Sequence, residues 1–184
     1  IGALQLIPSV GRTVAESTMA SSILVAYATQ FGSTRKVAEA IANVMRDGGC
    51  AVEVSRVEDV RSVDRYDAVI LGSAVHRGQL LPQAIEFVRR LCPRLREVPV
   101  AVFCMRISSP TLQSRHAYLN AIHEHVQPVS EVSFTGRFDR RGAALLIPWI
   151  FACLAPAIDR RNWTTIYAWA RDLRVQLTLS CGES

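Results

Sequence analysis

The chain has 184 residues, of which 49% are hydrophobic and 20% charged, and its formal net charge is +5 at pH 7. This length suits one domain with a buried core, and the composition excludes a disordered or collagen-like chain. The basic charge favours anionic partners. The sequence contains no interleaved basic and aromatic residues of the kind that bind nucleic acid, so we expect no nucleic-acid partner.

The segment before the first apolar run, residues 1–18, lacks the basic start and the uninterrupted apolar stretch of a signal peptide. We therefore expect it to be an extension, followed by a single domain over 19–184. The five cysteines form no C-x-x-C pair, so the sequence predicts neither a metal site nor a disulfide framework. Free thiols are typical of the reducing cytoplasm, where we expect the protein to reside.

Hydrophobic patterns predict alternating strands and helices in the first half of the chain. The apolar run 23–28 predicts a strand, and apolar residues at helical spacing follow it until Gly48 and Gly49, which suit a helix end. Alternation over 50–57 predicts a second strand. The almost wholly apolar run 67–75 predicts a third strand that is buried on both faces.

The same alternation continues in the second half. A helix is expected from Pro82, since proline suits a first helical turn, and 98–105 predicts a fourth strand. A further helix is expected over 111–126, a fifth strand over 131–138 and a closing helix over 163–173. This order predicts a parallel sheet with helices on both faces, in which ligands bind beyond the carboxyl ends of the strands.

A polar turn joins the first predicted strand to the first predicted helix. It contains three hydroxyl side chains, Thr29, Ser33 and Thr34, and Gly32 lets the backbone approach a ligand closely. Together with the positive end of the helix dipole, these donors suit a phosphate monoester, although the turn does not match a P-loop. The alternative is that Ser33 or Thr34 merely caps the helix.

The stretch YATQFGSTRKVAEAIA resembles the phosphate loop of flavodoxins, T/S-x-T-G-x-T, with Thr29, Gly32 and Thr34 at matching positions. The stretch RYDAVILGSAVHRGQLLPQAIEFV resembles the third strand of a flavodoxin and the flavin-contacting loop after it. The resemblance extends over nearly the whole chain from Ile23. It implies an α/β fold, a flavodoxin-like doubly wound sheet of five parallel strands in the order 2-1-3-4-5.

Within that superfamily the chain most resembles the menaquinone-dependent protoporphyrinogen dehydrogenase family, through GSAVHRGQ, LVAYATQFGSTRKVA and a basic insert before RNWTTIYAWARDL. The resemblance implies FMN as the cofactor, with its phosphate on the polar turn and its ring between the loops after the third and fourth strands. The implied phosphate contacts are Thr29, Gln30, Phe31, Gly32, Ser33 and Thr34. The implied ring contacts are Ser73, Ala74, Val75, His76, Arg77, Gly78, Gln79, Met105, Arg106, Ile107 and Ser108.

Two features distinguish this sequence from small electron-carrier flavodoxins, which are typically acidic and stack the flavin between aromatic side chains. This chain is basic, and neither ring loop contains an aromatic residue. Arg77 and Arg106 would stabilise an anionic reduced flavin and favour two-electron acceptance, unless they only face solvent. His76 suggests proton transfer, since imidazole titrates near neutral pH, with plain polar surface as the alternative. His76 and Arg77 are therefore the candidate catalytic residues.

The insert, at about 137–162, is the most unusual segment of the sequence. Its part Ala143 to Ile158 carries no charge and is flanked by paired arginines, yet it is shorter than the ~20 residues that span a bilayer. It suggests peripheral contact with a membrane or with a second copy in a homodimer, and an ordinary buried loop is the alternative. The candidate partners for carboxylates of a tetrapyrrole are Arg77, Arg106, Arg137 and Arg140.

The resemblance predicts an FMN-dependent oxidoreductase that oxidises protoporphyrinogen IX to protoporphyrin IX in heme biosynthesis, with a membrane quinone as electron acceptor. Such an enzyme would work in the cytoplasm, at the inner face of the cytoplasmic membrane. The alternatives are an NAD(P)H:quinone reductase, an electron-carrier flavodoxin and a flavodoxin-like binding module without FMN. Because fold analogy alone does not determine chemistry, these alternatives stay open at this point.

Overall fold

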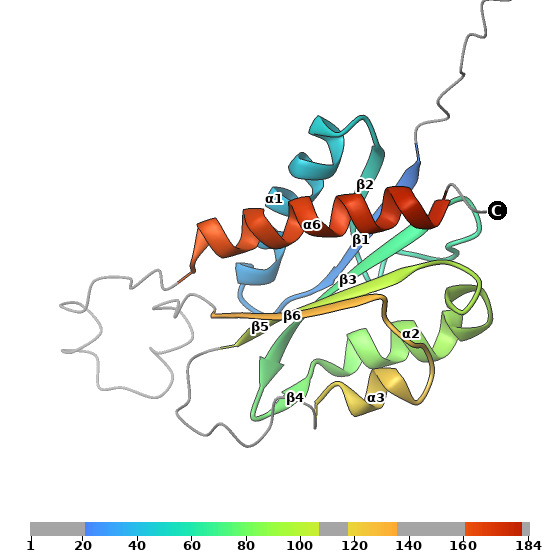
Figure 1. The fold of residues 1–184 in the computed structure, drawn as a ribbon. Coiled ribbons are helices and arrows are strands. Elements are labelled where there is room, and N and C mark those ends of the chain that lie inside the picture. Colours follow the sequence, from blue (N-terminus) through green and yellow to red (C-terminus); the bar gives the residue numbers. More distant parts are fainter. Residues whose placement is uncertain (1–20, 107–117, 136–160, 182–184) are drawn as a thin grey trace, which may run out of the picture.

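A computed structural model of the chain describes residues 21–106, 118–135 and 161–181. A central sheet lies between two layers of helices (Figure 1). Five parallel strands follow the order β2-β1-β3-β5-β6, and the short β4 pairs antiparallel with β3. Without β4 this is the order 2-1-3-4-5, so the predicted fold is confirmed. The elements are β1 Ser22–Ala28, α1 Ser33–Asp47, β2 Ala51–Arg56, β3 Ala68–His76, β4 Gln79–Leu80, α2 Pro82–Leu95, β5 Val100–Arg106, α3 Asn120–His123, β6 Ser130–Thr135 and α6 Trp163–Cys181.

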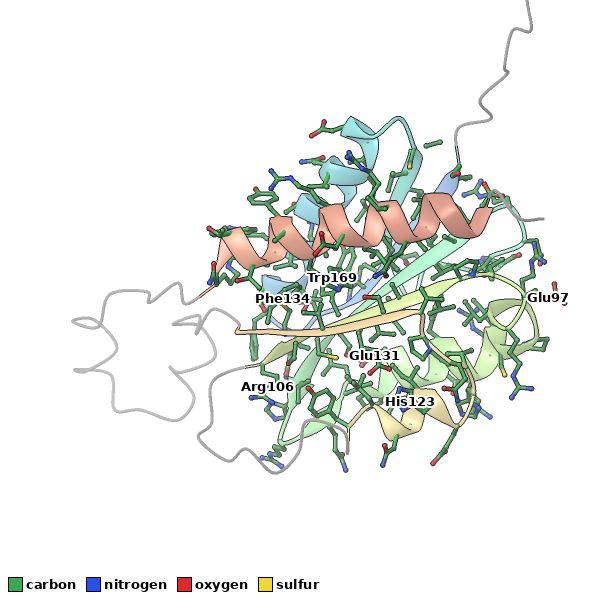
Figure 2. All side chains as sticks on the ribbon, viewed as in Figure 1. Glu97, Arg106, His123, Glu131, Phe134 and Trp169 are labelled. Carbon is green, nitrogen blue, oxygen red and sulfur yellow. The ribbon has the colours of Figure 1, made fainter. Side chains whose placement is uncertain are left out.

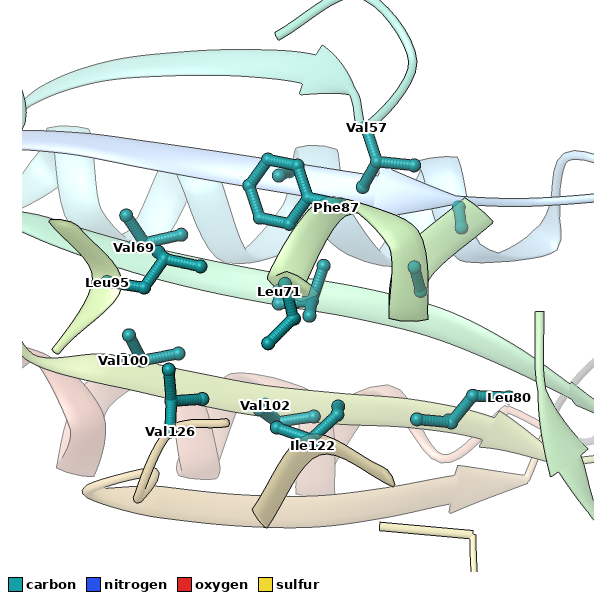
Figure 3. Packing of buried hydrophobic residues seen from close by; sticks show 14 of the residues in the cluster. Val57, Val69, Leu71, Leu80, Phe87, Leu95, Val100, Val102, Ile122 and Val126 are labelled. Atoms are coloured by element: carbon teal, nitrogen blue, oxygen red, sulfur yellow. The ribbon is translucent and has the colours of Figure 1, made fainter. Parts of the chain in front are cut away.

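Alternating side chains of the parallel strands supply both halves of the core. Ile23 and Val25 pack with the residues of α1 and α6, whereas Leu24 packs with those of α2 and α3. Figure 3 shows the second half, where Phe87 of α2 and Ile122 of α3 lie over the sheet. Because helices cover both faces, the central strands are apolar at almost every position, as the sequence predicts for the third strand.

Three elements differ from the sequence prediction. A helix is expected over 111–126, but in the part of this range that the structure describes only α3 is helical. The helix ends there because the N–H groups of His125 and Val126 both donate to the Ile122 carbonyl. The closing helix α6 continues beyond 173 to Cys181. Strand β4 was not predicted at all. Residues 111–117 of the expected helix and 136–138 of the expected fifth strand lie outside the described ranges.

In the part of the chain that the structure describes, Cys92 and Cys104 are free thiols. Within the same ranges no cluster of side chains is arranged to hold a metal ion, and no helix has the length and apolar character needed to cross a membrane.

Cys104 is expected to resist thiol reagents in the folded protein. Its side chain is fully buried on β5, and this burial raises the pKa of the thiol from 9.0 to about 12. Only the thiolate reacts, so a variant that keeps Cys104 as its single cysteine should react with a chromogenic disulfide at pH ~8 only after unfolding in urea. A matched variant that keeps only the half-buried Cys92 should react faster without urea. Rapid labelling of folded Cys104 would contradict this packing.

Candidate functional site

The carboxyl ends of β1, β3 and β5 meet at one edge of the sheet, and the segments after them form the candidate site. The register places Ala28 beside Ser73 and Val75 beside Arg106, so β3 continues past the end of β1. Figure 1 shows this edge on the left, with the first turns of α1 and α6 on the same side. Ligands of doubly wound sheets bind at such an edge.

The loop between β1 and α1 folds back on itself. The Gly32 N–H donates a hydrogen bond of 3.0 Å to Thr29 Oγ1, and Gly32 has a φ of 78°, a left-handed conformation that glycine adopts without strain. A Cβ at Gly32 would meet no atom of the described residues within 4 Å, so among them the space beside this backbone is open. The loop therefore leaves room for a ligand directly against the main chain.

The start of α1 is not capped by any side chain, because the N-cap residue is Gly32. The alternative that Ser33 or Thr34 serves as a cap is therefore wrong. Thr34 is fully buried, and its Oγ1 has no hydrogen-bond partner among the described residues. A buried hydroxyl without a partner is unfavourable, and the first turn contains no acidic side chain that would repel an anion. The uncapped helix start and the unpaired hydroxyl together fit a phosphate group.

Two further residues of this loop are open to solvent. Gln30 is exposed, and Phe31 leaves 46% of its surface accessible, which is unusual for a phenylalanine. An exposed ring beside an open stretch of backbone can contact a flat ligand. The sequence placed Phe31 in the loop, but its exposure follows from the tertiary structure.

The segment after β3 is a tight hairpin. Because β4 pairs with the end of β3, only Arg77 and Gly78 form the turn. Their φ values are 50° and 78°, and two positive values are characteristic of a type I′ turn. The sequence does not indicate this hairpin, since Asn, Asp or Gly usually occupies the position of Arg77. The remaining signal was the glycine at the second turn position.

Ser73 stabilises the base of this hairpin. Its Oγ donates to the Ala74 carbonyl at 2.9 Å and accepts a hydrogen bond from the Leu81 N–H at 3.2 Å. The hydroxyl is therefore engaged inside the protein, which leaves the hairpin backbone as the part that can contact a ligand. His76, by contrast, is exposed, and its side chain forms no hydrogen bond or ion pair with any residue that the structure describes.

The end of β5 contributes one buried and one accessible side chain. Met105 is only 3% exposed and packs in the core beneath α1 and α6, so its side chain belongs to the core. Arg106 is half-buried and lies at the strand end (Figure 2). The predicted site and insert residues outside the described ranges are Ile107, Ser108, Arg137, Arg140 and Ala143 to Ile158.

The described part of this edge is cationic. None of the residues 28–35, 73–81 and 104–106 is acidic. Neither Arg77 nor Arg106 pairs with a carboxylate within the described ranges. Such an edge stabilises a negatively charged ligand and negative charge that develops on it.

Comparison with protein families agrees with this architecture. A family model described as a flavodoxin domain matches residues 24–143, which is more than half of the chain. The chain belongs to this flavodoxin domain family. Membership implies FMN as the cofactor. The residues fit it, because the open Gly32 backbone, the uncapped start of α1 and the Thr34 hydroxyl lie where a phosphate would bind.

Individual relatives are distant. The chain is 24% identical over 100 residues to protoporphyrinogen IX dehydrogenase (quinone) of Escherichia coli strain K12, and the match covers 53% of this chain and 55% of that protein. It thus spans about half the length of the curated relatives it matches.

Solved structures show the same fold. An archaeal flavodoxin has a TM-score of 0.56 at 17% identity, over 85% of this chain and 99% of that one. Rubredoxin oxygen:oxidoreductase of Desulfovibrio gigas has a TM-score of 0.55 at 16% identity, over 86% of this chain and 36% of that one. At these identities the likeness shows the fold alone.

Proposed function

We propose that the protein is an FMN-dependent dehydrogenase that oxidises protoporphyrinogen IX to protoporphyrin IX and passes the electrons to a quinone. The observation that carries the proposal is the cationic site edge, where Arg77 and Arg106 occur without an acidic side chain in the described segments. A substrate that bears carboxylates suits this edge. The E. coli relative, whose name states this activity, supports the same choice.

The residues of this chain would contribute positioning and electrostatics. FMN supplies the electron-accepting group of the reaction when it is bound. The backbone of the loop Thr29–Gly32 and the start of α1 would hold the phosphate and so bring the cofactor to the carboxyl edge of the sheet. Arg77 and Arg106 would place positive charge where reduction adds negative charge, which favours electron acceptance.

The overall reaction balances without a further oxidant. Protoporphyrinogen IX loses six hydrogen atoms in three two-electron steps, and three quinone molecules take them up as quinols. His76 is exposed at the edge, and we propose that it carries protons between substrate and water, because an imidazole nitrogen can both accept and donate a proton.

The apolar insert is proposed to bring the site to a membrane. The uncharged stretch Ala143 to Ile158 between paired arginines supports contact with the inner face of the cytoplasmic membrane, where a quinone would be available. A homodimer contact is the alternative use of the same segment. Flotation with anionic liposomes tests the first, and the molar mass in solution tests the second. A monomer that does not float would contradict both.

The test of the function is an absorption spectrum of the purified protein with and without added FMN, followed by anaerobic addition of protoporphyrinogen IX. We expect a bound-flavin spectrum that bleaches with the porphyrinogen and returns with menaquinone. Bleaching by NADPH alone would instead indicate an NAD(P)H:quinone reductase. Bound flavin that neither compound reduces would indicate an electron carrier. A protein that takes up no FMN would contradict both the cofactor and the activity.

A further inference from the structure

The turn between β3 and β4 carries an arginine where the backbone disfavours one. Arg77 has a φ of 50°, in the left-handed region that glycine, asparagine and aspartate enter most readily. In two-residue hairpins of this type, Asn-Gly is the preferred pair. The Arg77 side chain is exposed, so core packing does not require it. An unfavourable backbone conformation at an exposed position is typical of a residue with a function.

Most arginines in the described ranges are engaged by the protein itself. They contact a carboxylate, a carbonyl oxygen or an aromatic ring, as Arg35 does with Glu39 and Arg90 with the Val60 carbonyl. The arginines without such a partner in these ranges are Arg61, Arg77, Arg106 and Arg171. Two of these four stand at the site edge.

Arg77 and Arg106 lie on either side of the end of β3. On one side of β3, Val75 pairs with Arg106 of β5. On the other side of β3, β4 pairs with the part of the strand that extends past the end of β1. The turn at Arg77 begins two residues after that pairing. With strands about 4.8 Å apart and a rise of about 3.3 Å per residue, the two backbones lie within roughly 10 Å. Two long side chains at that spacing can reach one ligand. Figure 2 shows Arg106 at this edge.

We propose that Arg77 recognises a carboxylate of the substrate and that Arg106 supplies a second cation. The inference rests on the proposed function, because it concerns the same flavin site, and it adds the residue that selects a carboxylate-bearing substrate. A guanidinium donates two parallel hydrogen bonds to one carboxylate, and protoporphyrinogen IX carries two propionate groups. The short turn fixes the backbone from which Arg77 reaches them.

Arg77→Asn is the central variant, because Asn-Gly suits the turn at least as well as Arg-Gly, so the melting temperature should not fall. In the FMN-loaded full chain we expect the KM for protoporphyrinogen IX to rise about tenfold to a hundredfold, the size of a lost charged hydrogen-bonded pair. Arg77→Lys keeps the charge but loses the paired donors, so its KM should lie between those of the wild-type protein and of Arg77→Asn.

The matched control is Arg171→Gln, which removes the same charge from an exposed position on α6.

A binding measurement tests the same contact without turnover. Binding of the product protoporphyrin IX, followed by its fluorescence, should weaken in Arg77→Asn relative to Arg171→Gln. Binding of the dimethyl ester, which has no carboxylate, should be equal in the two variants.

The possible results separate this inference from the proposed function. Equal KM and equal product affinity in Arg77→Asn and Arg171→Gln would overturn the inference and leave the function standing. Product binding that depends on Arg77, in a flavin-loaded protein that does not oxidise the porphyrinogen, would overturn the function and support the recognition. Equal affinity of the wild-type protein for the acid and the ester would overturn carboxylate recognition.

Discussion

Replacing Thr34 by valine is expected to weaken FMN binding and, at the same time, to stabilise the flavin-free protein. The Thr34 hydroxyl is fully buried and has no partner among the described residues, and such burial costs about 1–3 kcal/mol. Valine has nearly the same shape without this polar group. The free energy of unfolding of the flavin-free protein should therefore rise by about 1 kcal/mol.

The affinity for FMN, in contrast, should fall in the same variant. A hydroxyl that donates to a phosphate oxygen contributes about 1.5–3 kcal/mol, so its loss should raise the Kd of FMN about tenfold to a hundredfold. Quenching of flavin fluorescence gives the Kd, and urea unfolding of the flavin-free protein gives the stability. Thr164→Val, at an exposed position in the first turn of α6, is the matched control and should leave the Kd unchanged. A less stable Thr34→Val protein with normal FMN affinity would show that the hydroxyl has a partner within the protein.

Replacing Phe103 by alanine is expected to lower the free energy of unfolding by about 3–5 kcal/mol. The ring is fully buried on β5, and its centroid lies 6.4 Å from that of Phe134 and 6.3 Å from that of Trp169. Figure 2 shows the last two rings together between α6 and the sheet. Phe103 also covers Gly72 on the neighbouring strand, and a glycine has no side chain that could fill the cavity.

The same contact makes Gly72→Ala destabilising, because the added Cβ would overlap the Phe103 ring. We expect a loss of about 1–3 kcal/mol. In the double variant, removal of the Phe103 ring makes room for the added methyl group. The double variant should therefore lose less free energy of unfolding than the two single variants together, by about 0.5–3 kcal/mol. Urea unfolding of the four proteins measures this coupling. The control Phe31→Ala, in the exposed loop, should change stability by no more than about 0.5 kcal/mol. Additive losses would contradict the contact between Gly72 and Phe103.

Local sequence patterns were sufficient for the order of the elements other than β4 and for the position of the polar loop between β1 and α1. The apolar run 67–75 can be buried only if helices cover both faces, and alternation of such strands with helices leads to a parallel sheet. The loop after the first strand could be located because several hydroxyls and a glycine are adjacent in the chain. Both signals extend over neighbouring residues, so no long-range contact is needed to detect them.

Tertiary structure decided how the site residues are used. The burial of Thr34 and the packing of Met105 depend on the packed core, in which segments that are distant in sequence meet. The Ser73 hydroxyl is engaged within the β3–β4 hairpin, by the Leu81 N–H. The hairpin at Arg77 forms because β1 ends early and leaves one side of β3 open for β4. Long-range contacts engage some of the arginines, as Arg90 with the Val60 carbonyl and Arg96 with the His125 carbonyl. Residue identity and local spacing therefore determined the fold and the position of the polar loop between β1 and α1. Burial and hydrogen-bond partners, which are properties of the packed chain, determined which groups remain available to a ligand.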